Sequence, residues 1–350
     1  MRLQRRSCLP FAQLMHYTSR LMIRAGFLLL FFFTLTLCAS ADTVIDRLKS
    51  VRLSGGSYIR ISDWAEAIRF ETKWLQKGRS LEATSRWSRL IFNIGSAKAE
   101  MNGVRLWLSR APRIWKGAAY ISRLDLEKTI MPVLHPPTTR ANQISTVCLD
   151  PGHGGSDPGN SEGRYREKSL TLELARSVRK KLEAAGLKVV MTRDSDKGLK
   201  LNSRPAVALK HKADLFISIH FNSAPGAGRS ANGPEVYCLT PPGAASTNAG
   251  GRGVTSVAYP GNRHDRENAL LAHQVQRALV NADAPRDRGV KRARFAVLRY
   301  AAMPAILVEA GFMSNHTELK NLTSSTHREK MARAIADGIL GYKRTVERDD

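Results

Sequence analysis

Four side chains in the C-terminal half of the chain combine the functional groups of a hydrolytic metal site. His153 lies in a glycine-rich turn after an apolar run, His220 and Glu309 end two further apolar runs, and Glu167 begins an amphipathic stretch. Two imidazoles and a carboxylate suit a tetrahedral Zn²⁺ ion whose fourth position stays open for water. A further glutamate that binds no metal is what such a site needs as general base. Together the four residues predict metal-assisted hydrolysis.

The spacing of these residues differs from that of the common zinc motifs. It matches neither the H-E-x-x-H pattern nor a cysteine-rich zinc signature, so a structural zinc site is not expected. Taken one at a time, a histidine or a glutamate is more often a hydrogen-bonded polar residue than a metal ligand. Their common placement at the ends of predicted elements is what favours a site.

The elements that would carry these side chains alternate between apolar strands and amphipathic helices. Continuous apolar strands alternating with such helices indicate an α/β domain with a mainly parallel sheet, flanked by helices on both faces. In sheets of this kind, functional residues gather at the C-terminal ends of the strands. Strands are predicted at 144–149, 188–191, 215–219, 236–239 and 305–308, and helices at 168–185, near 268–280 and at the C-terminus.

Composition divides the rest of the chain into further parts. All five tryptophans lie between residues 64 and 115, and the proline-containing stretch 135–143 favours a linker. Short β-rich pieces alternate with brief helical ones before this stretch. We therefore predict a small α+β domain at 42–134 and a catalytic domain at 144–345. The tryptophans serve either as packing residues of the small domain or as a surface on which sugars stack.

The first 41 residues carry the pattern of a signal peptide. An uncharged apolar run at 25–37 follows two arginines and precedes Ala39-Ser40-Ala41, and it is too short to span a bilayer. We predict cleavage near Ala41 and export to the periplasm or to the cell wall and extracellular space. No stable membrane anchor is expected. Met22 is an alternative start to Met1, because it leaves a compact cationic segment before the apolar run.

The chain is strongly basic, with 55 Lys and Arg against 30 Asp and Glu and a formal net charge of +25. Residues 1–41 hold five of the arginines and no acidic residue, so +20 remains on the exported part. This charge favours an anionic partner, and export makes nucleic acid an unsuitable one. We therefore expect an anionic polymer of the cell wall. Cys148 and Cys238, which remain after cleavage, lie in apolar runs and are predicted to be buried free thiols.

Seven sequence motifs follow one another in the C-terminal half. They read LDPGHGG with DPG, EK, TRDSD, ADLFISIHFN, GPEVY, DRGVKRARFAVLR and MPAILVEAGFMSN. With these motifs, residues 144–343 resemble the zinc-dependent N-acetylmuramoyl-L-alanine amidases of the Amidase_3 type. The resemblance implies that His153, Glu167 and His220 hold one catalytic zinc ion and that Glu309 is catalytic. It also implies peptidoglycan as the substrate, cleaved at the amide bond between the lactyl group of N-acetylmuramic acid and L-alanine of the stem peptide.

Several positions depart from the pattern of this family. Asn160 replaces the usual alanine after DPG, and Phe221 replaces a small residue beside His220. Ser169 and Thr171 stand where Asp and Asn are common. None of these departures removes a ligand or the catalytic glutamate.

The region before the linker has a repeated spacing of its own. Tyr58-Ile59 with Asp63-Trp64 recurs as Tyr120-Ile121 with Asp125-Leu126, and IGSAKAEMNG stands between them. Because of this spacing, residues 50–135 resemble the copper amine oxidase N-terminal-like domain that is attached to many exported cell-wall enzymes. The resemblance implies an accessory α+β module. It implies no copper chemistry, because the region before the linker holds no His or Cys ligand set.

Two functions from other classes also fit the residues. One is a non-catalytic cell-wall binding protein that kept the fold, although all four site residues are present. The other is an exported zinc carboxypeptidase with a similar site. The products formed on cell-wall material distinguish the three functions.

Overall fold

The computed structural model describes residues 41–137, 143–224, 226–250, 252–282, 284 and 286–347. The predicted signal peptide therefore lies outside the described residues, apart from Ala41, and so do residues 138–142 of the predicted linker. The chain divides into a short unit, Met1–Val44, and a large unit, Ile45–Asp350, with helix α2 (Ala41–Asp46) at the junction. Among the helices of the described ranges, none combines the length and apolarity needed to cross a membrane.

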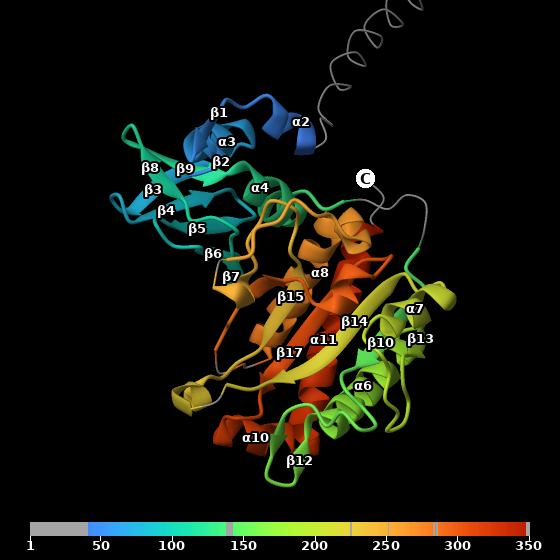
Figure 1. The fold of residues 1–350 in the computed structure, drawn as a ribbon. Coiled ribbons are helices and arrows are strands. Elements are labelled where there is room, and N and C mark those ends of the chain that lie inside the picture. Colours follow the sequence, from blue (N-terminus) through green and yellow to red (C-terminus); the bar gives the residue numbers. More distant parts are fainter. Residues whose placement is uncertain are drawn as a thin grey trace, which may run out of the picture. The chain divides into compact units, whose positions relative to one another are not determined.

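Within the described residues of the large unit, eleven strands form one sheet (Figure 1). In sheet order they are β13 (Lys188–Met191), β10 (Thr146–Pro151), β14 (Leu215–Asn222), β17 (Ala305–Phe312), β15 (Glu235–Leu239), β16 (Val290–Ala293), β7 (Val104–Trp107), β6 (Lys98–Met101), β5 (Arg89–Asn93), β4 (Ser80–Thr84) and β3 (Glu71–Gln76).

The prediction of a mainly parallel sheet was wrong, because this sheet is mixed. Strands β13, β10, β14 and β17 are parallel, but β15 runs antiparallel to β17, and β7 to β3 form an antiparallel meander. The connection from β14 to β15 contains the 3₁₀ turn η2 (Gly226–Ser230) and no described crossover helix of the kind that parallel strands need. The meander strands are joined by tight turns, which antiparallel pairs alone accommodate.

Helices cover both faces of the catalytic part of the sheet, as predicted for an α/β fold. Helix α11 packs against both α6 and α8 over one face, whereas α7 and α9 pack together over the other. Ala305 and Leu307, alternate residues of β17, belong to the core under α7 and α9. The helices are α6 (Glu167–Ala184), α7 (Ser203–Lys210), α8 (Asp265–Asn281), α9 (Ala296–Arg299), α10 (His316–Leu322) and α11 (Ser325–Val346), with 3₁₀ turns η3 (Thr247–Ala249) and η4 (Pro260–His264).

A second sheet belongs to the N-terminal region, where strands and short helices mix. Its order is β1 (Ser50–Leu53), β2 (Gly56–Arg60), β9 (Ala118–Ser122) and β8 (Arg113–Trp115). In the C-terminal half, a separate hairpin pairs β11 (Ser161–Glu162) with β12 (Tyr165–Arg166). The helical pieces are α3 (Ile61–Ala67), α4 (Arg123–Asp125), the π-helical turn η1 (Leu126–Ile130) and α5 (Met131–Leu134).

Strand β7 of this region pairs in parallel with β16, Leu106 opposite Val290, so one sheet crosses the boundary drawn at 135–143. The division into two domains stays a prediction. The tryptophans of the region differ in role, because Trp64 is buried against Phe92 whereas Trp87 is 77% exposed. Cys148 and Cys238 are both buried and free, which confirms the prediction for these thiols.

Candidate metal and catalytic site

Three neighbouring strands and one helix bring the four predicted residues to one cleft. His153 follows β10, Glu167 opens α6, and His220 and Glu309 lie in β14 and β17. All four line a cleft of about 540 Å³. His220 and Glu309 lie within their strands rather than at the predicted ends, because β14 and β17 continue to pair beyond the register pair His220 and Glu309.

The two histidines and Glu167 form a compact cluster of donor atoms. One ligand atom from each of the three residues lies within 4.8 Å of the others. Nδ1 of His220 is 2.9 Å from Oε1 of Glu167, and Nε2 of His153 is 3.1 Å from Oε2. The Glu167 carboxylate is 1% exposed and is therefore shielded from bulk water. Such a cluster of nitrogen and oxygen donors can hold a metal ion.

The pKa values in the cluster favour an ionised carboxylate. Burial alone would raise the pKa of Glu167, but hydrogen bonds and charges from His153 and His220 outweigh it and place this pKa well below its usual value. Burial would lower the pKa of His153, but contacts with Glu167 and Asp157 raise it overall. Because a metal ion binds the neutral imidazole, metal binding would compete with protonation of His153.

Glu309 lies beside this cluster with an unused acceptor. Its Oε2 is buried and has no hydrogen-bond partner among the described residues. Burial raises the pKa of Glu309 well above the usual value, the charges of Glu167 and Glu235 add to the rise, and Lys291 opposes it. A buried carboxylate whose pKa is raised in this way is suited to accept a proton as a general base.

The sequence of this domain matches a known family. Residues 147–341, more than half of the chain, match the family Amidase_3, described as N-acetylmuramoyl-L-alanine amidase. The chain belongs to this family.

Named relatives are about one third identical to this Amidase_3 chain over the residues that align. N-acetylmuramoyl-L-alanine amidase LytC of Bacillus subtilis strain 168 is 35% identical over 213 residues, which cover 59% of this chain and 38% of LytC. N-acetylmuramoyl-L-alanine amidase AmiA of Escherichia coli K12 is 32% identical over 254 residues, covering 63% of this chain and 84% of AmiA. The solved structure of AmiC2 of Nostoc punctiforme is 33% identical and covers 58% of this chain and 98% of its own, with a TM-score of 0.48. The chain thus spans less than two thirds of LytC.

Two residues that the sequence did not single out orient His153 in this Amidase_3 site. Oδ2 of Asp157 lies 2.8 Å from Nδ1 of His153, which directs Nε2 toward Glu167. Arg204 of α7 donates a hydrogen bond of 2.9 Å to the carbonyl oxygen of His153. His153 has a left-handed backbone with φ of 61°, a conformation that such contacts must maintain. Asp157 could have been predicted from the sequence, because it belongs to the DPG motif four residues after His153.

Two glycines allow the ligands to approach closely. A Cβ atom at Gly152 would lie 2.3 Å from Cε1 of His220, and one at Gly159 would lie 2.6 Å from Cδ2 of His153 and 2.7 Å from Oε2 of Glu167. Neither position can carry a larger residue without displacing a ligand. Gly152 of the LDPGHGG motif and Gly159 of the DPG motif are therefore explained by close contact with the candidate metal ligands.

Two of the departures from the family pattern, Asn160 and Phe221, contact Glu167. Nδ2 of Asn160 donates to Oε2 of Glu167 and to the carbonyl oxygen of Phe221, both at 2.8 Å. The backbone N–H of Phe221 donates to Oε1 of Glu167 at 3.1 Å, and its side chain is buried. Thr171 donates to the carbonyl oxygen of Gly152 at 3.0 Å. The side chain of Asn160 and the backbone of Phe221 thus hold the carboxylate, and Thr171 holds the turn before His153.

Proposed function

We propose that this protein is a zinc-dependent peptidoglycan amidase. It would cleave the amide bond between the lactyl group of N-acetylmuramic acid and L-alanine of the stem peptide. The observation that carries the proposal is the cluster of His153, Glu167 and His220 beside Glu309, in one cleft of an Amidase_3 domain. The names of LytC and AmiA as N-acetylmuramoyl-L-alanine amidases support the choice of bond.

The donor set fits one zinc ion. His153, Glu167 and His220 supply two nitrogens and one carboxylate oxygen, a set found in catalytic zinc sites that keep one position for water. Oε2 of Glu309 has no hydrogen-bond partner among the described residues. It can therefore accept a hydrogen bond from a water or from a substrate group beside the cluster. A zinc ion held by these three residues would supply an activated water and would polarise the scissile carbonyl.

The side chains around the cleft supply the other parts of the reaction. Glu309 accepts the proton of the attacking water at its carboxylate and delivers it to the leaving nitrogen as the C–N bond breaks. Asp157 keeps the imidazole of His153 in the orientation that presents Nε2. Apolar residues of the loop before α7 and of α9, among them Leu199, Phe295 and Val297, line the cleft and reduce its water content.

Digestion of purified peptidoglycan sacculi tests this function. We expect the intact chain to release stem peptides and leave lactyl ends, and we expect a chelator to abolish the release until zinc is restored. Mass spectrometry identifies the products. Loss of a single terminal residue would instead indicate a carboxypeptidase, and binding without any new product would indicate a cell-wall binding protein.

The cellular location and the N-terminal region are part of the same proposal. A peptidoglycan substrate requires export, which the signal-peptide pattern of residues 1–41 predicts. The mixture of strands and short helices before the linker is compatible with an accessory module like the copper amine oxidase N-terminal-like domain. We propose a periplasmic or extracellular enzyme.

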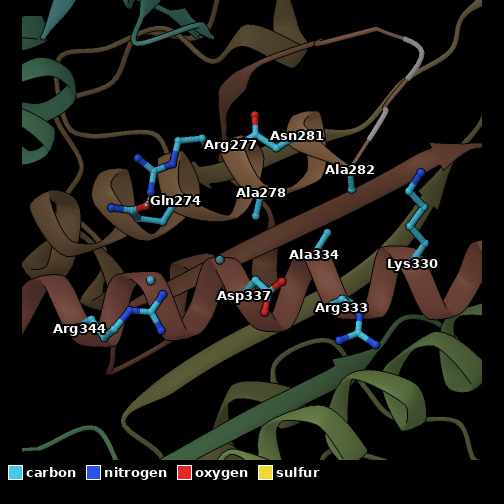
Figure 2. A pocket seen from close by; sticks show the side chains of 12 residues that line it. Gln274, Arg277, Ala278, Asn281, Ala282, Lys330, Arg333, Ala334, Asp337 and Arg344 are labelled. Atoms are coloured by element: carbon cyan, nitrogen blue, oxygen red, sulfur yellow. Dashed lines mark hydrogen bonds between the residues drawn. The ribbon is translucent and has the colours of Figure 1, made fainter.

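A basic groove offers a place for an anionic wall polymer. It has a volume of about 420 Å³ and lies between α8 and α11 (Figure 2). Arg277 of α8 and Lys330, Arg333 and Arg344 of α11 line it, with Asp337 as the acidic residue among its described lining. Small residues between these side chains leave the helix surfaces accessible to an extended chain. This local charge agrees with the +20 of the exported part.

Charge reversal in the groove should weaken attachment to the wall. We expect the double variant Arg333→Glu, Arg344→Glu to bind sacculi about tenfold less tightly at low salt, with a smaller difference at high salt because exposed charges are screened. Co-sedimentation with sacculi over a range of salt concentrations measures the effect. The variant Lys73→Glu, Lys77→Glu on β3 and the turn after it changes the net charge equally and serves as control. Equal weakening in both would mean that overall charge, not the groove, governs binding.

A further inference from the structure

A buried carboxylate next to Glu309 is held by the segment 287–292. Glu235 is 1% exposed, and its Oε2 lies 2.6 Å from Nε of Arg288 and 2.5 Å from Nζ of Lys291. Its Oε1 accepts hydrogen bonds from the hydroxyl of Tyr237 at 2.7 Å and from Nδ2 of Asn222 at 2.8 Å. Both oxygens therefore have two donors each, which fixes the position of this carboxylate.

Glu235 is placed to influence the catalytic strand directly. It is the register partner of Glu309 across the antiparallel pair of β15 and β17. Side chains of directly opposed residues lie on the same face of a sheet, with Cβ atoms about 5 Å apart. Asn222, which also binds Glu235, follows the metal-ligand candidate His220 by two residues in β14. A displacement of Glu235 would therefore also displace Glu309 and strand β14, which carries His220.

Strand β7 of the N-terminal region also contacts the segment 287–292. The backbone N–H of Arg105 donates to Oδ2 of Asp287 at 2.6 Å, and Nε1 of Trp107 donates to the carbonyl oxygen of Arg288 at 2.9 Å. Nζ of Lys291 lies 5.7 Å from the centre of the Trp107 ring. Trp107 thus contacts the backbone of Arg288 and the side chain of Lys291, the two residues whose cations bind Glu235.

Two further contacts show that the N-terminal region packs closely against the segment 287–292. A Cβ atom at Gly289 would lie 2.6 Å from the carbonyl oxygen of Arg105, so β7 and this segment touch through their backbones. The buried Arg292 donates to the carbonyl oxygen of Lys128 at 2.5 Å and to Oγ1 of Thr129 at 2.8 Å in η1. Without β7, strand β16 would become an open edge of the sheet.

We propose that the N-terminal region is a positioning element of the amidase site rather than a detachable wall-binding module. Strand β7, through Trp107, fixes Arg288 and Lys291, and these cations fix Glu235 beside Glu309. Trp107 and Lys291 are positioning residues, because neither replaces Glu309 in the reaction. The inference rests on the proposed amidase function for its effect on rate, and on the contacts alone for its effect on structure.

Kinetics on a soluble muropeptide test the effect on rate. We expect Trp107→Ala and Lys291→Met to lower kcat at least about tenfold, with KM and zinc content little changed, because misplacement of a base affects the chemical step. Lys291→Arg keeps a cation near Glu235 and should recover most of kcat. Lys291→Met is expected to fold, because Arg288 still pairs with Glu235. Wild-type kcat in Trp107→Ala and Lys291→Met would overturn the proposal.

A matched control is available on the second sheet. Trp115 of β8 is half-buried like Trp107 and also has a lysine at its ring, Lys116 at 4.8 Å, but it lies outside the sheet that contains β16. Trp115→Ala should leave kcat unchanged. Equal losses in both tryptophan variants would mean general destabilisation and would overturn the positioning role.

Hydrogen exchange separates this inference from the amidase proposal. We expect Trp107→Ala to speed amide exchange in peptides covering 287–292 and 235–239, whereas Trp115→Ala leaves them protected. This result is independent of turnover. If the wild-type chain released no stem peptides, the amidase function would fail, and unchanged exchange in Trp107→Ala would separately overturn the coupling between the N-terminal region and Glu235.

Discussion

Glu309→Gln is expected to lose at least about 10²-fold in kcat on peptidoglycan while it retains bound zinc, the loss typical of a missing general base. The amide keeps the volume of the side chain but cannot accept the proton of the attacking water. Oε2 of Glu309 has no hydrogen-bond partner among the described residues, so the substitution breaks no hydrogen bond at that atom. Release of stem peptides, followed by mass spectrometry, measures the rate, and metal analysis of the same sample measures zinc.

The control for this variant is an exposed glutamate that does not line the cleft. Glu173→Gln on α6 removes a carboxylate that pairs with Arg328 at 2.8 Å on the surface, and kcat should not change. Full activity in Glu309→Gln would remove Glu309 from the mechanism. Loss of zinc together with activity would instead assign Glu309 to the metal site.

The pH dependence of the wild-type chain follows from the same residue. Burial and the charges of Glu167 and Glu235 raise the pKa of Glu309, and the base works only when it is deprotonated. Activity should therefore fall as the pH drops through this raised pKa, well above the value of about 4.3 for an ordinary glutamate.

The grouping of the four candidate residues in one cleft was predictable because their types and their placement agree. His153, His220 and Glu309 follow or end apolar runs, and neighbouring strands bring such positions to one edge of a sheet. The direction of β15 was not predictable in the same way. A strand buried on both faces shows the same continuous apolar run whether its neighbour is parallel or antiparallel, and the reversal depends on a connection without a crossover helix.

The continuation of the sheet into the N-terminal region also escaped sequence reasoning. The residues of β7 alternate between buried and half-buried positions, which identifies a strand, but its partner Val290 lies far along the chain. Pairing between distant strands leaves no local signal. The two prolines near residue 136 favoured two separate domains. The pairing of β7 with β16 instead joins the two regions in one sheet.

The positive charge has two roles that composition cannot separate. Exposed cations such as Arg333 and Arg344 belong to the groove between α8 and α11. Arg193, Arg204 and Arg292 are instead buried, with side chains that donate to backbone carbonyl oxygens and to Asp150. A single arginine in a short helix such as α7 normally indicates a surface position. The buried Asp150 at the end of β10 was the available sign that a cation must lie opposite.

Arg204→Met is expected to destabilise the fold by about 3–5 kcal/mol, the typical effect of removing one partner from a buried ion pair. Nη1 of Arg204 lies 2.9 Å from Oδ1 of Asp150, and the two side chains are 3% and 0% exposed. Thr192 and Ser218 also donate to Asp150, at 2.6 and 2.8 Å, but both are neutral. The variant leaves a buried carboxylate without its cation. Urea unfolding monitored by circular dichroism measures the loss as a lower midpoint at unchanged slope.

Two further variants show whether the buried charge is the cause. Arg176→Met removes an arginine whose pair with Asp194 at 3.0 Å is about half exposed, and this change should cost less than about 1 kcal/mol. Adding Asp150→Asn to Arg204→Met removes the unpaired charge and should recover part of the stability. Because Arg204 also donates to the carbonyl oxygen of His153, the single variant should weaken zinc retention as well. If Arg204→Met cost no more than Arg176→Met, the ion pair would not support the turn that carries His153.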